Sequence, residues 1–126
     1  MYIRFVINRT DNRSHQPQGV FAAAYHLLEH GDLSADQHEC LREILEWFAD
    51  NLPVPKRLDM TDRATFWFYA SARRHIGRMW ELSNLLQSHD VFVFVQARGS
   101  LRNCVYRDAF QVAACPSPHS DPVRTR

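Results

Sequence analysis

The sequence is poor in the residues that form phosphate-binding loops. It has only 4 glycines among 126 residues, and they are scattered at positions 19, 31, 77 and 99. A phosphate loop needs closely spaced glycines, because side chains would keep the backbone away from the phosphate. Neither G-x-G-x-x-G nor G-K-[ST] occurs. We therefore expect no standard nucleotide-binding loop.

Long apolar runs and paired cysteines are also missing. No apolar run approaches the roughly 18 residues that cross a bilayer, so we expect no contact with membranes. The 3 cysteines, Cys40, Cys104 and Cys115, form no C-x-x-C pair. An odd cysteine count suits a reducing compartment, and the first residues lack the pattern of a secretory signal peptide. These features predict a cytoplasmic location, reduced cysteines and a Cys40 side chain in the core.

Charge is balanced overall but not along the chain. The formal net charge is +1, yet residues 1–60 carry 6 basic and 9 acidic side chains, and residues 61–126 carry 9 and 5. No overall field therefore directs the protein to nucleic acid or to a membrane. The difference between the halves is compatible with a contact to a partner, and also with attraction between the two halves of one chain.

The hydrophobic patterns predict an α+β fold. They indicate a small, mainly antiparallel sheet of about four strands packed with three helices, in the order β-α-α-α-β-β-β. Residues 1–115 are expected to form a single globular domain, and the Pro- and Ser-containing residues 116–126 a disordered tail. In chain order, we expect a strand at 2–8, helices at 19–30, 34–52 and 61–89, and strands at 91–97, 104–106 and 110–114.

Local signals refine several of these elements. Ser34 and Gln37 have the spacing of a capping box, and Gly31 stands where a helix would end. Residues 91–95, VFVFV, are apolar on both faces of a strand. Such a strand is typical of a sheet interior, so we expect it to have neighbours on both sides and to be covered by the third helix.

Two histidines fit a metal-binding motif. Residues 26–30 read HLLEH and match the H-x-x-E-H pattern of inverzincin metallopeptidases. His26 and His30 are one helical turn apart and could bind Zn²⁺ together. A catalytic zinc needs a third protein ligand, and the sequence offers only Tyr106 and Asp108 at about the right separation, in a predicted turn. We therefore interpret His26 and His30 as solvated side chains and predict neither a zinc site nor any other cofactor.

A ribonuclease-like centre is a second possibility. His75, His89 or Tyr106 could act as acid and base, with an arginine stabilising the charge that develops on phosphate. The sequence does not show whether these side chains converge, so this hypothesis stays open.

The predicted helix at 61–89 carries an unusual outer face. If the segment is helical, this face lies opposite the apolar stripe that contains Ile76 and Met79. Tryptophan and arginine are enriched where proteins bind one another, which predicts a partner-binding face. Alternatively, its arginines pair with the acidic outer face of the preceding helix. The predicted interaction face consists of Arg63, Trp67, Arg74, Arg78 and Leu85.

These observations favour a small cytoplasmic protein that acts through protein–protein contacts without catalysis, such as a regulator, an adaptor or an inhibitor subunit. The alternative is a protein that acts on nucleic acid, either an RNase-like toxin or an RNA or DNA binder that uses the basic C-terminal half. The sequence leaves the oligomeric state open.

Overall fold

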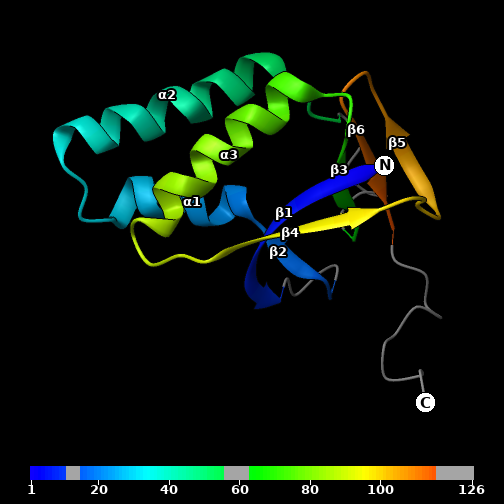
Figure 1. The fold of residues 1–126 in the computed structure, drawn as a ribbon, viewed down its shortest axis with the longest axis horizontal. Helices are drawn as coiled ribbons and strands as arrows, with labels where there is room; N and C mark the ends of the chain where they lie inside the picture. Colours follow the sequence, from blue (N-terminus) through cyan, green and yellow to red (C-terminus); the bar gives the residue numbers. More distant parts are fainter. Residues whose placement is uncertain (11–14, 56–62, 116–126) are drawn as a thin grey trace.

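The computed structural model describes residues 1–10, 15–55 and 63–115, and these have the expected α+β architecture. Three helices pack on a mostly antiparallel sheet of six strands (Figure 1). The elements, in chain order, are β1 (Tyr2–Thr10), β2 (Pro17–Gly19), α1 (Val20–His30), α2 (Ala35–Asn51), β3 (Thr65–Tyr69), α3 (Arg73–Gln87), β4 (Val93–Arg98), β5 (Cys104–Arg107) and β6 (Gln111–Ala114). The predicted tail at 116–126 lies outside the described residues.

The fold class is confirmed, whereas the predicted order of elements is wrong in two places. The order is β-β-α-α-β-α-β-β-β, because β2 and β3 were not expected. The short strand β2 lies where the polar composition predicted only a loop, and it pairs with β1. The predicted strands at the positions of β1, β4, β5 and β6 are all present.

The larger correction concerns the helix predicted at 61–89. Only its second half, α3, is helical, and the residues of β3 form a strand instead. Their sequence, TFWFY, consists of Thr and aromatic residues, which favour a strand when neighbouring strands accept them. Here β3 pairs with β1 on one side and β6 on the other, and this pairing outweighs the helical periodicity. Thr61, the expected start of the helix, lies outside the described part of the chain.

Strand β1 is the centre of the sheet. Along one edge it pairs with β4 over six residues, from Tyr2 opposite Arg98 to Ile7 opposite Val93. Its other edge is shared by β3, which pairs at Tyr2 and Ile3, and β2, which pairs further along. The path of the sheet is β2-β1-β3-β6-β5, with β4 branching from β1.

One face of this sheet packs against the helices and forms the main core. On α2, Leu41, Ile44, Leu45 and Phe48 recur at helical spacing and are buried, and Leu52 at its end is half-buried. The buried residues of this core are Phe5, Ile7, Val20, Ala24, Leu41, Ile44, Leu45, Phe48, Phe68, Met79, Leu82 and Leu86. Cys40 on α2 is exposed, so the expectation that it lies in the core is wrong. The three cysteines all lie in the described segments, and no disulfide joins them.

Strand β4 does not occupy the interior position that was predicted for it. It pairs with β1 alone, so its outer edge has no partner strand within the described ranges. Phe92 is 72% exposed, Phe94 51% and Val95 42%. An apolar run of this length specifies neither how many strands lie alongside nor whether its side chains are covered. The prediction of two neighbours was therefore wrong.

Helix ends follow the local signals with one difference. The Ser34 hydroxyl accepts the Gln37 N–H and the Gln37 side chain accepts the Ser34 N–H, each at 3.1 Å, which confirms the capping box. Gly31 does follow α1, but its φ of −78° is not left-handed. Glycine is needed there because a side chain would overlap Leu27.

We expect Ser34→Ala to lower the free energy of unfolding by about 1 kcal/mol, because the Gln37 N–H at the start of α2 loses its acceptor, the Ser34 hydroxyl. Urea denaturation of wild type and variant measures the change. Ser100→Ala, in the exposed β4–β5 connection, is the control and should stay within about 0.5 kcal/mol of wild type. Equal effects at both positions would contradict a stabilising cap.

Candidate interaction surface

The five residues of the predicted interaction face do not lie on one helix. Arg63 is an exposed turn residue before β3, and Trp67 lies within β3 with only 5% of its surface exposed. Arg74, Arg78 and Leu85 are on α3. The proposal of one continuous face fails for Arg63 and Trp67, because that part of the chain is not helical.

Trp67 belongs to the interior of the sheet. Its indole Nε1–H donates to the Thr65 hydroxyl at 2.9 Å, and the Arg98 guanidinium lies over its ring, 5.5 Å from the centroid. Since alternate strand residues point to opposite faces and Phe68 faces the helices, Trp67 occupies the other face. It is a packing residue rather than an exposed anchor for a partner.

The two arginines of α3 contact α2 through an aromatic ring. The guanidinium groups of Arg74 and Arg78 lie 5.8 and 5.3 Å from the ring centroid of Trp47 on α2. Arg78 also contacts Glu81 of its own helix at 3.4 Å. The alternative interpretation, arginines facing the preceding helix, thus describes the contact better, although the partner is a tryptophan and not an acidic side chain. Leu85 is partly buried against the core.

We expect Arg74→Ala/Arg78→Ala to lower the free energy of unfolding by about 1–2 kcal/mol, because each half-exposed guanidinium–indole contact contributes roughly 0.5–1 kcal/mol. Denaturant titration measures the loss. Arg73→Ala removes an exposed arginine from the same helix and serves as the matched control. If the double variant is as stable as wild type, these contacts with Trp47 do not stabilise the fold.

His26 and His30 lie together on α1, as the motif predicted. Their rings are 5.0 Å apart and both residues are exposed. Across the described segments, no three His, Cys, Asp or Glu side chains are grouped so that they could hold a metal ion. The two histidines therefore form an exposed pair on the surface of α1.

The candidate ribonuclease residues are not brought together. His75 is buried near the start of α3, with Nε2 2.8 Å from the Asn51 carbonyl oxygen and its ring 4.2 Å from that of Phe110. His89 follows the other end of α3, and at 1.5 Å per residue the two lie on the order of 20 Å apart. They cannot act on one phosphate group together.

Tyr106 serves the β5–β6 turn. Its hydroxyl donates to Asp108 Oδ2 at 2.6 Å, while Asp108 Oδ1 accepts the N–H groups of Phe110 at 2.7 Å and Gln111 at 3.0 Å. The hydrogen bond to Asp108, with burial as a second cause, raises the pKa of Tyr106 to about 12. This tyrosine is therefore protonated at neutral pH. Burial acts to raise the pKa of Asp108, but the hydrogen bonds from Tyr106, Phe110 and Gln111 outweigh it and leave that pKa below its usual value.

The lowered pKa makes the Asp108 contribution to stability dependent on pH. The charged carboxylate stabilises the fold above the unfolded-state pKa of about 3.9, and this contribution is lost as pH falls through the lower folded-state pKa. We expect Asp108→Asn to be less stable than wild type at pH 7 and the gap to close in acid. Melting temperatures across this pH range test it; a gap that persists unchanged at the acid end would contradict the assignment.

Exposed large apolar side chains gather around β4 instead. Phe92 directly precedes β4; Phe94 lies opposite Val6 and points to the face away from the helices, whereas Val95 lies opposite Phe5 and points to the face that the helices cover. Trp80 on α3 is 50% exposed and packs edge-on against Phe5, with ring centroids 5.1 Å apart. Phe5 is the β1 partner of Val95, so Trp80 lies over the same part of the sheet. We call Trp80, Phe92, Phe94 and Val95 the β4 patch.

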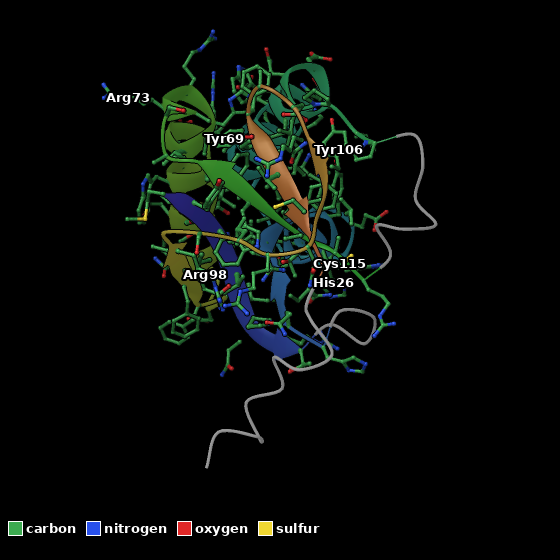
Figure 2. The ribbon with its side chains drawn as sticks, turned by 90° about the vertical axis from the view of Figure 1, so that its right-hand side faces the viewer. His26, Tyr69, Arg73, Arg98, Tyr106 and Cys115 are labelled. Atoms are coloured by element: carbon green, nitrogen blue, oxygen red, sulfur yellow. The ribbon has the colours of Figure 1, made fainter. Side chains whose placement is uncertain are left out.

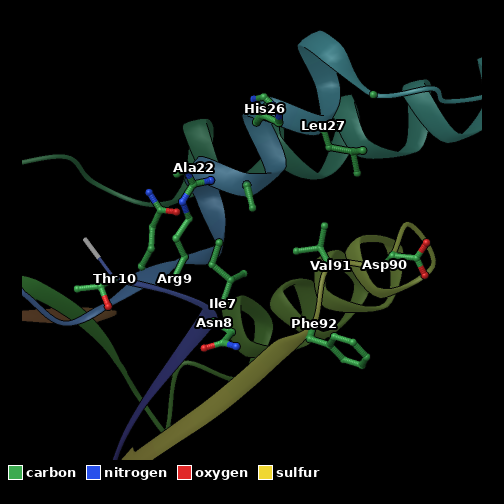
Figure 3. Close-up of a pocket in the computed structure, with 13 residues that line it drawn as sticks. Ile7, Asn8, Arg9, Thr10, Ala22, His26, Leu27, Asp90, Val91 and Phe92 are labelled. Atoms are coloured by element: carbon green, nitrogen blue, oxygen red, sulfur yellow. The ribbon is translucent and has the colours of Figure 1, made fainter. Parts of the chain in front are cut away.

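A hollow of about 750 Å³ adjoins the β4 patch where the end of β1, helix α1 and the α3–β4 turn meet. Figure 3 shows Val91 turned toward α1 and Phe92 turned the other way. Phe92 belongs to both the hollow and the patch. The walls combine apolar and polar side chains, namely Ile7, Asn8, Arg9, Thr10, Gln18, Ala22, Ala23, His26, Leu27, Asp90, Val91 and Phe92.

A second group of functional interest lies on the face of the sheet away from the helices (Figure 2). The rings of Tyr2 and Tyr69 are 5.8 Å apart, and a hydrogen bond to Tyr69 is the main cause that raises the pKa of Arg107. Arg98 lies over Trp67 on the same face. No sequence pattern indicates this group, because its members come from four different strands.

Comparison of the chain with protein-family models, curated proteins and solved structures finds no match. In the described part of the chain, no helix has the length and apolar character needed to cross a membrane. The function has to be inferred from the protein's own residues.

Proposed function

We propose that this protein is a non-enzymatic protein-interaction module that binds its partner at the outer edge of β4. The observation that carries the proposal is the β4 patch, four large apolar side chains exposed beside a strand edge without a partner. From their exposed fractions, these side chains present about 400 Å² of apolar surface, taking 150–250 Å² for an aromatic side chain. This surface lies on both sides of the open edge, with Phe94 on the face away from the helices and Val95 and Trp80 on the face that they cover.

The chemistry of a strand edge favours an extended protein segment as the partner. The unpaired N–H and C=O groups of an edge strand can bond with another strand, and the side chains on alternate positions supply specificity. Edge strands that stay unpaired usually carry charged residues that prevent pairing. Residues 91–97 carry none, which supports a role in binding.

This location differs from the one expected from sequence. Arg74 and Arg78 contact Trp47, and Trp67 is buried. These residues therefore present less unoccupied surface to a partner than β4 does. The expectation of a protein-interaction function is retained as a proposal, with its surface moved to the β4 patch.

A nucleic-acid binder is the second candidate, favoured by the aromatic and basic side chains on the opposite face. Tyr2 and Tyr69 could stack on bases while Arg98 and Arg107 contact the backbone of a single strand. Such binding would weaken steeply with salt. An oligonucleotide titration at two salt concentrations distinguishes it, because binding through the β4 patch is mainly apolar.

We expect Phe94→Lys to lose the partner protein while keeping the fold, because a charge on the exposed edge blocks an incoming strand. Affinity capture from lysate of the source organism, with quantitative mass spectrometry, compares wild type and variant. Loss of a hot-spot side chain costs about 2 kcal/mol or more, so the captured amount should fall about 30-fold.

Tyr25→Lys is the matched control, since Tyr25 is 48% exposed and lies on α1, outside the β4 patch and outside the lining of the hollow. The control should capture the same protein as wild type, and all three proteins should melt within a few degrees of one another. Equal capture by wild type and Phe94→Lys would show that the interaction surface lies elsewhere.

A further inference from the structure

We propose that the partner at this edge is a second copy of the same chain, with β4 of one protomer pairing antiparallel to β4 of the other. This inference rests on the proposed function and names the occupant of the same surface. A two-fold axis perpendicular to β4 relates identical surfaces and makes the paired strands antiparallel. The axis passes near Phe94, and the two sheets continue into each other.

The charge pattern of the strand supports this arrangement. Between Asp90 and Arg98 there are seven uncharged residues, so no like charges oppose each other along the edge. With Phe94 on the axis, antiparallel pairing brings Asp90 of one copy to the end that carries Arg98 of the other. Parallel pairing would instead place like charges together. Arg98 lies over the Trp67 ring of its own chain. The opposite charges of Asp90 and Arg98, at the two ends of the segment, favour antiparallel approach even if they form no ion pair.

The backbone of β4 is oriented correctly for such pairing. The Val93 N–H donates to the Gln87 side chain at 3.4 Å, not to β1, so it faces the outer edge. Next to β3, the Met1 carbonyl accepts the Ala70 N–H. Because alternate residues of a strand direct their backbone N–H and C=O groups to opposite edges, the odd-numbered residues of β1 direct theirs toward β3 and away from β4. Both observations leave the N–H and C=O groups of Val93, Val95 and Ala97 pointing outward. An axis at Phe94 then pairs Val93 of one copy with Val95 of the other, and the Val95 carbonyl of the second copy replaces Gln87 as the acceptor of the Val93 N–H.

The side chains match on both faces. On one face Phe94 would meet Phe94 of the second copy, and on the other Val93 and Val95 would meet each other beside the two Trp80 rings. Aromatic and β-branched side chains form favourable cross-strand pairs.

The β4 patch covers about half of the roughly 800 Å² that each partner buries in a standard interface, which predicts a weak dimer. An unrelated protein would need an extended, uncharged segment to pair with this edge, and residues 91–97 of a second copy are such a segment.

The test uses full-length protein in sedimentation velocity experiments from about 1 μM to about 1 mM. Wild type should change from monomer to dimer with a Kd on the order of 10 μM. Phe94→Glu and Phe94→Lys should each weaken dimerisation at least about tenfold, because they place like charges on the axis. An equimolar mixture of the two variants should dimerise again, since opposite charges then meet. A mere loss of folding would not be reversed by mixing.

Tyr25→Glu and Tyr25→Lys, alone and mixed, are the matched controls and should dimerise like wild type. Wild type that stays monomeric up to about 1 mM overturns the proposed dimer; so does a mixture no more associated than its components. If the monomer nevertheless captures another protein in a Phe94-dependent manner, the proposed function stands and only its occupant is wrong. If neither capture nor dimerisation depends on Phe94, both proposals fail.

Discussion

The rest of the structure depends on the pairing of β1 along both of its edges. Six consecutive residues of β1 pair with β4 on one side, and β3 and β2 share the other side. Because β3 continues through β6 to β5, β1 joins all the strands into one sheet. Its central residues are buried whichever face they point to, including Phe5 toward the helices and Val6 away from them. Removal of this strand would separate β2, β4 and the group β3-β6-β5 from one another.

A second constraint joins the helix layer to the sheet. The His75 ring lies 4.9 Å from that of Trp47 on α2, 6.1 Å from that of Phe68 on β3 and 4.2 Å from that of Phe110, which directly precedes β6. Its Nε2 reaches the Asn51 carbonyl at the end of α2, which satisfies a group that the helix itself leaves free. A buried histidine with this many aromatic neighbours is explained by packing. The arginines that lie above Trp47 extend the same contact to the surface.

The position of β4 follows from β1 and explains the exposed apolar surface. A strand that pairs with only one neighbour presents its other edge to solvent, and β4 has no charged residue until Arg98 to discourage association. In water, such an edge is at risk of uncontrolled pairing unless a defined partner covers it. A self-complementary edge offers one solution, because a closed two-fold pair leaves neither copy of the edge free. The same residues that look like an aggregation hazard would then be the interface.

Sequence alone determined the features that depend on neighbours within a few residues. These are the stripe of α2, the capping box at Ser34, the β5–β6 hairpin, the α+β class and the paired histidines of α1. Each follows from local periodicity or from a hydrogen bond over three or four residues. Tertiary structure alone decided that Thr65–Tyr69 is a strand, that Trp67 is buried and that β4 lies at an edge. Those outcomes depend on β1, more than 60 residues away in the chain. A strand is stabilised by the strands beside it, and its own sequence does not specify which strands those are.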